Sequence, residues 1–118
     1  MSCRRRETAM AQGVNRYRAD LRDIRFLLFE QLQIAQLLVE EPFAGWGIDE
    51  VQMVLDEVYR YARDISGPVD RVGDQQGCRL QQGRVEAPEG FARAYRAVYE
   101  QGWKTLDVPS EFGGQDAP

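Results

Sequence analysis

The sequence predicts an all-α fold: a small helical domain of three main helices with long loops, and one short hairpin as an open alternative. Two observations predict it. Apolar residues recur at spacings of three and four in three stretches, and long polar segments with Gly and Pro separate these stretches. Leu, Ile, Val and Phe supply 28 of the 118 residues, about 24%, above the roughly 20% below which chains tend to stay disordered. We expect one folded domain over residues 17–118 and a disordered tail over residues 1–16.

The first predicted helix covers residues 21–39. Asp20 precedes it as an N-cap, and Asp23 occupies a weak capping-box position. Its apolar residues cover more than half of the circumference: Leu21, Ile24, Phe26, Leu27, Leu28, Phe29, Leu32, Ile34, Ala35 and Leu38. A helix this apolar needs contacts on more than one side, so it either lies centrally or is covered by something outside this chain. The candidate interface residues are Leu21, Ile24, Phe26, Leu28 and Phe29.

The second predicted helix covers residues 49–65 and follows a loop that contains Pro42 and Trp46. Asp49 and Gln52 form a capping-box pattern at its start. It has the clearest amphipathic stripe in the chain: Val51, Val54, Leu55, Val58, Ala62 and Ile65. Gly67-Pro68 marks either its end or a kink, and Val69 and Val72 can extend it by a further turn before Gly73.

A short hairpin and a third helix are predicted in the last part of the chain. Residues 78–80 and 84–86 flank Gln81-Gln82-Gly83, which suits a hairpin turn. The third helix covers about 14 residues, with Pro88 in its first turn and Gly102 just past its end. Its predicted buried residues are Phe91, Ala94, Tyr95 and Val98. Residues 103–118 are expected to be irregular.

Composition excludes several classes of function. The sequence contains no His, which excludes Ser–His and Cys–His catalysis and histidine ligation of metals. Cys3 and Cys78 are too few for a zinc site and poorly placed for a disulfide, so we expect reduced thiols and a cytoplasmic protein. No run of about 18 apolar residues predicts a membrane span.

Charge is distributed unevenly along the chain. Residues 1–25 carry seven Arg and three acidic residues, whereas residues 26–118 carry eight basic and sixteen acidic residues. The formal net charge of −4 argues against nucleic acid as the main partner. The Arg4-Arg5-Arg6 cluster is interpreted as part of a solvated tail in preference to a basic binding segment.

Other chemical groups in the sequence have ordinary explanations. Neighbouring carboxylates on a helix point about 100° apart, so the adjacent acidic pairs do not converge on one substrate. These pairs are Glu40-Glu41, Asp49-Glu50 and Asp56-Glu57. The glycine pairs lack the Gly-Lys-Ser/Thr of a phosphate loop. Tyr95 and Tyr99 are expected to pack in the core or at an interface, with a ligand-lining role as the alternative.

Two segments carry a family resemblance. The first is residues 17–30, Tyr-Arg-Ala-Asp-Leu-Arg-Asp-Ile-Arg-Phe-Leu-Leu-Phe-Glu. The second extends from Pro68 to Gly114 and ends in Pro109-Ser110-Glu111-Phe112-Gly113-Gly114-Gln115. In the order and spacing of these blocks, the chain resembles the N-terminal helical region of the acyl-CoA dehydrogenase family, in particular its long bacterial members of the methylmercaptopropionyl-CoA dehydrogenase type. Asp116 departs from the pattern, because the family usually has Gly there.

The resemblance implies an FAD-dependent enzyme that introduces an α,β double bond into acyl-CoA thioesters. In that family the flavin and the catalytic Glu belong to later domains, so no catalytic, cofactor-binding or metal-binding residue is carried over to this chain. The resemblance therefore implies a fragment that binds no FAD and is inactive alone. Phe112, Gly113 and Gly114 are the only residues that it places on the substrate side.

The sequence leaves two functional hypotheses open. The first is the fragment hypothesis, with the remaining domains or a further subunit of an acyl-CoA dehydrogenase as partners, in a homo-oligomer or a hetero-complex. The second is a helical protein–protein interaction module that uses the apolar helix over residues 21–39.

Overall fold

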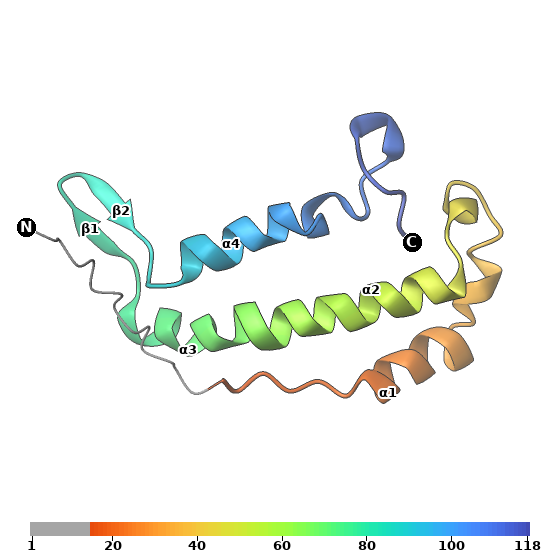
Figure 1. The fold of residues 1–118 in the computed structure, drawn as a ribbon, viewed down its shortest axis with the longest axis horizontal. Helices are drawn as coiled ribbons and strands as arrows, with labels where there is room; N and C mark the ends of the chain where they lie inside the picture. The colour runs from red at the N-terminus through yellow and green to blue at the C-terminus, as the bar shows by residue number, and fades with distance from the viewer. Residues whose placement is uncertain (1–14) are drawn as a thin grey trace, which may run out of the picture.

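The computed structural model describes residues 15–118, which form a mostly helical arrangement with one hairpin. Figure 1 shows three layers: α1 (Leu21–Arg25) with its flanking segments, a long central rod of α2 (Ile48–Tyr61) and α3 (Gly67–Gln76), and α4 (Phe91–Glu100) on the opposite side of the rod. The hairpin of β1 (Arg79–Gln81) and β2 (Arg84–Glu86) joins α3 to α4. The predicted fold class, with three main helices and a hairpin, is confirmed. The Arg4–Arg6 cluster and Cys3 lie outside the described residues.

The first helix is shorter than predicted. Its start is confirmed, because the Arg22 backbone N–H donates to the Asp20 side chain at 2.9 Å. α1 continues through a π-helical turn, Phe26–Gln31, but Gln33 then adopts a left-handed backbone conformation with φ of 51°. The chain turns there and Leu38 becomes buried. The prediction of one helix over residues 21–39 is wrong because burial of Leu38 requires a change of direction that local periodicity does not report.

The Asp20 cap also binds the side chain of Arg22. Hydrogen bonds from the Arg22 guanidinium, and then from the Arg22 backbone N–H, lower the pKa of Asp20 to about 2. The guanidinium nitrogen Nη2 lies 2.7 Å from Asp20 Oδ2. Both side chains are exposed to solvent, so this pair fixes the local start of α1 and adds little to global stability.

The central rod passes through the Gly67-Pro68 dipeptide without ending. Pro68 has no N–H to donate, and the helix accommodates it with a π-helical turn, Ala62–Ser66, in which the Gly67 N–H bonds to the Ala62 carbonyl. The extension through Val69 and Val72 is confirmed, and the helix ends at Gln76. Asp49 is not the N-cap as predicted. The helix begins one residue earlier, at Ile48, so Asp49 lies in its first turn. There the positive end of the helix dipole stabilises its carboxylate.

The hairpin is confirmed, with a tighter turn than expected. Gln81 pairs with Arg84, so only Gln82 and Gly83 form the turn, and both have positive φ values of 49° and 76°. Two residues with positive φ form a type I′ turn, whose twist matches that of the paired strands.

α4 begins at Phe91, three residues later than Pro88. Gly102 follows its end with φ of 79°, as predicted for a helix C-terminus. Ala94 and Ala97 are the buried residues of α4, and Val98 is half-buried. The predicted burial of Phe91 and Tyr95 is wrong, because these residues are 38% and 62% exposed. Two small side chains let α4 approach the rod closely, and Tyr95 lies beside this contact.

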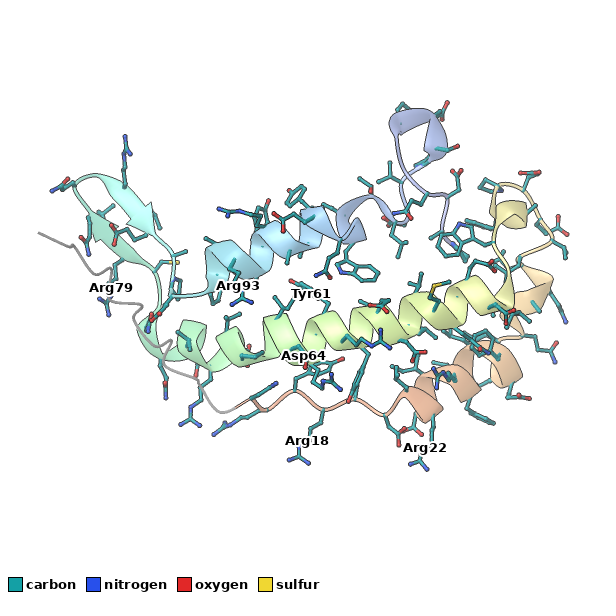
Figure 2. The ribbon with its side chains drawn as sticks, in the orientation of Figure 1. Arg18, Arg22, Tyr61, Asp64, Arg79 and Arg93 are labelled. Carbon is teal, nitrogen blue, oxygen red and sulfur yellow. The ribbon has the colours of Figure 1, made fainter. Side chains whose placement is uncertain are left out.

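Polar contacts join the outer layers to the central rod, and two of them involve partly buried side chains. Arg25 Nη2 lies 2.7 Å from Asp56 Oδ1, which joins α1 to α2. Tyr61 Oη donates to the Ala94 carbonyl at 3.1 Å, and Figure 2 shows Tyr61 between α2 and α4. These contacts link α1 to α2 and α2 to α4, between layers that contribute few buried side chains.

The Tyr61→Phe substitution is expected to lower the free energy of unfolding by about 0.5–1.5 kcal/mol, because it removes only the hydrogen bond to Ala94. Urea denaturation followed by circular dichroism measures the change. Tyr59→Phe is the matched control, because the Tyr59 ring packs beside Tyr17 and Arg63 and is retained in Phe. Equal effects of the two substitutions would contradict the assigned role of the Tyr61 hydroxyl.

Candidate functional site

The C-terminal loop, residues 103–117, contains the predicted substrate-side residues. Its two halves are joined by three backbone hydrogen bonds, from the N–H groups of residues 115, 116 and 117 to the carbonyls of residues 105, 108 and 106, at 2.9 to 3.1 Å. Ala117 is buried. These bonds hold the loop in one backbone conformation although it contains little regular secondary structure.

Trp46 anchors this loop to the segment that precedes α2. Its indole Nε1 donates to the Gln115 carbonyl at 2.7 Å, across 69 positions of sequence. Figure 1 shows the C-terminus close to the start of α2. The loop is therefore positioned by the fold.

The Trp46→Phe substitution is expected to release the C-terminal loop partly, because it keeps an aromatic ring and removes the N–H donor. We expect about 1–2 kcal/mol lower stability and faster amide hydrogen exchange at residues 114–117. Trp103→Phe is the control, because the Trp103 indole donates only to Gln101 on its own segment. Unchanged exchange in the Trp46 variant would contradict the anchoring role.

Phe112, Gly113 and Gly114 lie in the outer part of the C-terminal loop. Phe112 is 75% exposed at the end of a 3₁₀ turn, Ser110–Phe112. Gly113 has φ of 84°, and Gly114 passes so close to Val108 that a Cβ on it would lie 1.8 Å from the Val108 carbonyl oxygen. Both glycines therefore have conformational or steric reasons to be Gly.

Asp116 has a backbone conformation that favours glycine, with φ of 51°. Its carboxylate Oδ1 accepts a hydrogen bond from the Ser110 N–H at 2.8 Å and so supports the 3₁₀ turn before Phe112. Asp and Asn are the residues that tolerate this region best after Gly. The departure from the family pattern therefore preserves the turn and gives it a side-chain hydrogen bond.

The candidate interface residues occupy two environments. Leu21, Ile24, Leu28 and Phe29 are half-buried, whereas Phe26 is 62% exposed. Further exposed apolar residues follow α1 in sequence: Leu27, Leu32, Leu37 and Val39. We call Phe26, Leu27, Leu32, Leu37 and Val39 the N-terminal apolar surface. In Figure 1 α1 and the C-terminal loop lie on opposite sides of the central rod, so the structure does not bring the two candidate sites together.

Two open grooves were not predicted from the sequence. One, of about 600 Å³, lies between α1 and the start of α2 and is lined by Arg22, Arg25, Phe26, Phe29, Glu30, Ile48 and Gln52. The other, of about 410 Å³, lies between the rod and the end of α4 and is lined by Glu57, Arg60, Tyr61, Asp64, Ile65, Gln101 and Trp103. In the second groove a hydrogen bond from Arg63 lowers the pKa of the Asp64 carboxyl. No local sequence pattern signals either groove, because each is formed by residues of separate elements.

Tyr95 and Tyr99 form an exposed pair on α4. Their rings meet edge to face with centroids 5.0 Å apart, and their hydroxyl oxygens are 2.7 Å apart. The hydrogen bond with Tyr95 raises the pKa of Tyr99. This geometry stabilises one turn of α4 and leaves most of both side chains in solvent.

The described residues do not form a site suited to a flavin. A flavin-sized ligand is normally enclosed over most of its surface with a few converging polar groups. Among residues 15–118, no polar or charged residue is buried, and the grooves are open. The same residues contain no cluster of metal-ligating side chains and no helix long and apolar enough to cross a bilayer.

Comparison with known proteins gives relatives of one kind. The chain is 33% identical over 102 residues to 3-methylmercaptopropionyl-CoA dehydrogenase of Ruegeria pomeroyi, a match that covers 86% of the chain and 17% of the relative. It is 33% identical over 90 residues to a butyryl-CoA dehydrogenase of Syntrophomonas wolfei, covering 73% of the chain and 15% of the relative. It is 30% identical over 110 residues to a broad-specificity linear acyl-CoA dehydrogenase of Mycobacterium tuberculosis, covering 89% of the chain and 18% of the relative.

The extent of these matches defines the relationship. No family model matches the chain. The chain spans about a sixth of the length of the curated relatives, yet the matches cover most of its own length. The chain is therefore homologous to one segment of the acyl-CoA dehydrogenase family.

Proposed function

We propose that this chain provides the N-terminal helical region of an FAD-dependent acyl-CoA dehydrogenase and is catalytically inactive alone. The relatives named above support the enzyme class, since each is named as an acyl-CoA dehydrogenase. The observation that carries the proposal is the incomplete burial of apolar side chains. Phe26, Leu32, Val39 and Phe112 are each at least 62% exposed.

Exposed apolar area on this scale is unusual for a self-contained domain. Among the described residues the buried apolar side chains are one Leu, one Val and three Ala. The radius of gyration is 18.9 Å, whereas a compact domain of this length has about 13.5 Å. Burial of the N-terminal apolar surface under another protein surface would contribute a favourable free energy of about 25 cal/mol per Å² of apolar area. We infer that the remaining domains or a further subunit of the enzyme supply that surface.

Inactivity alone follows from the chemistry that the family resemblance implies. Removal of an α-proton from an acyl thioester requires a positioned base, and hydride transfer requires a bound flavin. The described residues offer neither an enclosed flavin site nor a buried carboxylate. Glu111, next to Phe112, is exposed and is not proposed as the base.

The C-terminal loop is proposed to contact the substrate side of the assembled enzyme through Phe112, Gly113 and Gly114. The loop's backbone hydrogen bonds and the Trp46 anchor hold Phe112 in place while its ring stays in solvent. An aromatic side chain on a fixed loop can bind an apolar chain without the entropy cost of ordering the loop.

The proposal is tested with two assays. The purified chain, mixed with FAD, an acyl-CoA series and an artificial electron acceptor, is expected to give no turnover. For the second assay, the matching segment is deleted from the Ruegeria pomeroyi relative, and this chain is added to the shortened enzyme as a separate polypeptide. Restored turnover that depends on the chain is the expected result. Turnover by the chain alone would contradict inactivity, and failure to restore activity to a folded, flavin-loaded acceptor would contradict the proposed role.

In the restored enzyme, Phe112→Ala is expected to raise KM for acyl-CoA about tenfold with little change in the stability of the chain, because Phe112 makes few contacts within it. Leu80→Ala is the matched control, because Leu80 is also 75% exposed and lies on the hairpin. Equal KM changes for both variants would contradict the substrate-side location of Phe112.

A second candidate function, a helical interaction module, is favoured by the N-terminal apolar surface itself. It predicts a stable complex with a partner other than a dehydrogenase domain. Phe26→Asp is expected to abolish that complex, whereas Ala92→Asp on α4 is expected to leave it intact. A location in the cytoplasm and assembly into a homo-oligomer or hetero-complex are also proposed, since Cys78 is an exposed free thiol and the apolar residues need cover.

A further inference from the structure

The hairpin is exposed to solvent along its whole length. All six residues of β1 and β2 are exposed, and Leu80 and Val85, which are direct cross-strand partners, are 75% and 71% exposed. Figure 1 shows the hairpin at the end of the molecule, beyond α3 and α4. A two-stranded hairpin is at best marginally stable by itself, so further pairing or packing would stabilise it.

The register determines which backbone groups of the hairpin are free to pair. The two residues that flank a two-residue type I′ turn, Gln81 and Arg84, form a hydrogen-bonded pair. Pairs alternate along an antiparallel ladder, so Leu80 and Val85 form a non-hydrogen-bonded pair. The N–H and C=O of Val85 therefore point away from β1, at the edge of β2 that no other strand among residues 15–118 occupies.

We propose that β2 pairs antiparallel with β2 of a second copy of this chain, about a two-fold axis at Val85. The Val85 N–H of each copy would donate to the Val85 carbonyl of the other copy. Arg84 of each copy would lie opposite Glu86 of the other copy. The two Arg84–Glu86 pairs between the copies would be non-hydrogen-bonded pairs, in which opposed side chains approach most closely.

Charge complementarity selects this pairing over others at the same hairpin. The two-fold arrangement places opposite charges across the interface twice. A two-fold pairing of β1 with β1, centred on Leu80, would place Arg79 opposite Gln81 and gain no ion pair. A pairing of β1 with β2 of another copy would be head-to-tail, and such contacts do not close into a dimer.

The dimer should be weak because the interface is small. Each copy contributes a three-residue strand. Its buried area falls at the low end of specific interfaces, so we expect a dissociation constant on the order of 0.1 mM. The two-fold pairing would also place Leu80 and Val85 of both copies in one apolar row across the new sheet.

Charge reversal tests the pairing by sedimentation equilibrium under reducing conditions, which prevent a disulfide through Cys78. Arg84→Glu places like charges opposite each other at both positions, and so does Glu86→Arg. Each variant alone is expected to weaken self-association at least tenfold. An equimolar mixture of the two variants is expected to associate again. In the mixed dimer, the two acidic side chains of one variant lie opposite the two basic side chains of the other. Lys104→Glu, which has the same change in charge as Arg84→Glu and lies away from the hairpin, is expected to behave as the unmodified chain.

Amide hydrogen exchange supplies a readout at single residues. On raising the protein concentration from about one tenth to about ten times the dissociation constant, exchange of the Val85 amide is expected to slow, whereas that of the Leu80 amide is not. Exchange of the Gln81 and Arg84 amides, which bond to each other within one copy, reports whether the hairpin is folded in each charge variant.

Three outcomes would overturn the proposal. They are a monomer at all concentrations up to 1 mM, self-association that persists in both charge variants, and protection of the Leu80 amide in place of Val85. In the second case, loss of association in Phe26→Asp would assign it to the N-terminal apolar surface. None of these outcomes bears on the proposed dehydrogenase role, which the restored-turnover assay tests separately.

Discussion

Replacing Gly114 by Ala is expected to disrupt the C-terminal loop and to lower the free energy of unfolding by at least about 3 kcal/mol. A Cβ at this position would lie 1.8 Å from the Val108 carbonyl oxygen and 2.3 Å from its carbon. Both are backbone atoms, so no rotation of a side chain relieves the clash. The same carbonyl accepts the Asp116 N–H at 3.1 Å, and moving it would also break this hydrogen bond.

Gly113→Ala is the matched control, because it separates backbone conformation from close approach. Gly113 has φ of 84°, yet a Cβ there would have no neighbour within 4 Å. The cost should therefore be the roughly 1–2 kcal/mol of a left-handed Ala. Urea denaturation with Trp fluorescence measures both variants, since Trp46 is bonded to the Gln115 carbonyl. A smaller loss in Gly114→Ala than in Gly113→Ala would contradict this account of the loop.

Replacing Ala94 by Asp is expected to detach α4 from the central rod, with a loss of about 3 kcal/mol or more in the free energy of unfolding. Ala94 is 8% exposed and lies where α4 contacts the rod. A carboxylate there would be buried beside Ile65 and Val69, which line the adjoining grooves. The Tyr61 hydroxyl would also lose its position against the Ala94 carbonyl.

Ala92→Asp controls for helix propensity and for the helix dipole. Ala92 lies two residues earlier on the same helix and is exposed. The control should stay within about 0.5 kcal/mol of the unmodified chain. Amide exchange across α4 and circular dichroism measure the difference. If both variants retain α4, the contact through small residues does not hold this layer.

The two predictions bear on function because both elements position the proposed substrate-side residues. α4 leads directly into the C-terminal loop, and the loop presents Phe112. A variant that loses the loop should therefore fail to restore turnover in the two-chain assay, even if α1, α2 and α3 remain folded. Gly113→Ala, which keeps most of the loop's stability, should restore more activity than Gly114→Ala.

Features that depend on a few neighbouring residues could be predicted from the sequence. Asp20 begins α1, Gln82-Gly83 forms the turn of the hairpin, and Gly102 follows the end of α4. Each depends on atoms within about four residues, namely a carboxylate near a free N–H or a glycine with positive φ. The special conformation at Asp116, where the family usually has Gly, is also visible in the sequence pattern.

The candidate sites could be predicted only in part. The excess of apolar residues in residues 21–39 left two alternatives open, a central position in the domain or cover from outside the chain. Within the part of the chain that the structure describes, Phe26, Leu27, Leu32, Leu37 and Val39 are exposed. Which residues remain exposed could not be predicted. Phe26 lies in solvent while Leu28 is half-buried, and the two grooves are formed by residues from distant positions.

The sequence by itself determined the helical class, the positions of the main turns and caps, and the family to which this segment is homologous. Only the tertiary structure decided that the chain turns at Gln33, that α2 continues through Pro68 into α3, and that Trp46 fixes the C-terminal loop. The physical reason is that a periodic pattern states which side chains are apolar but not which surface covers them. The direction of each segment is chosen by burial and by hydrogen bonds between residues far apart in sequence.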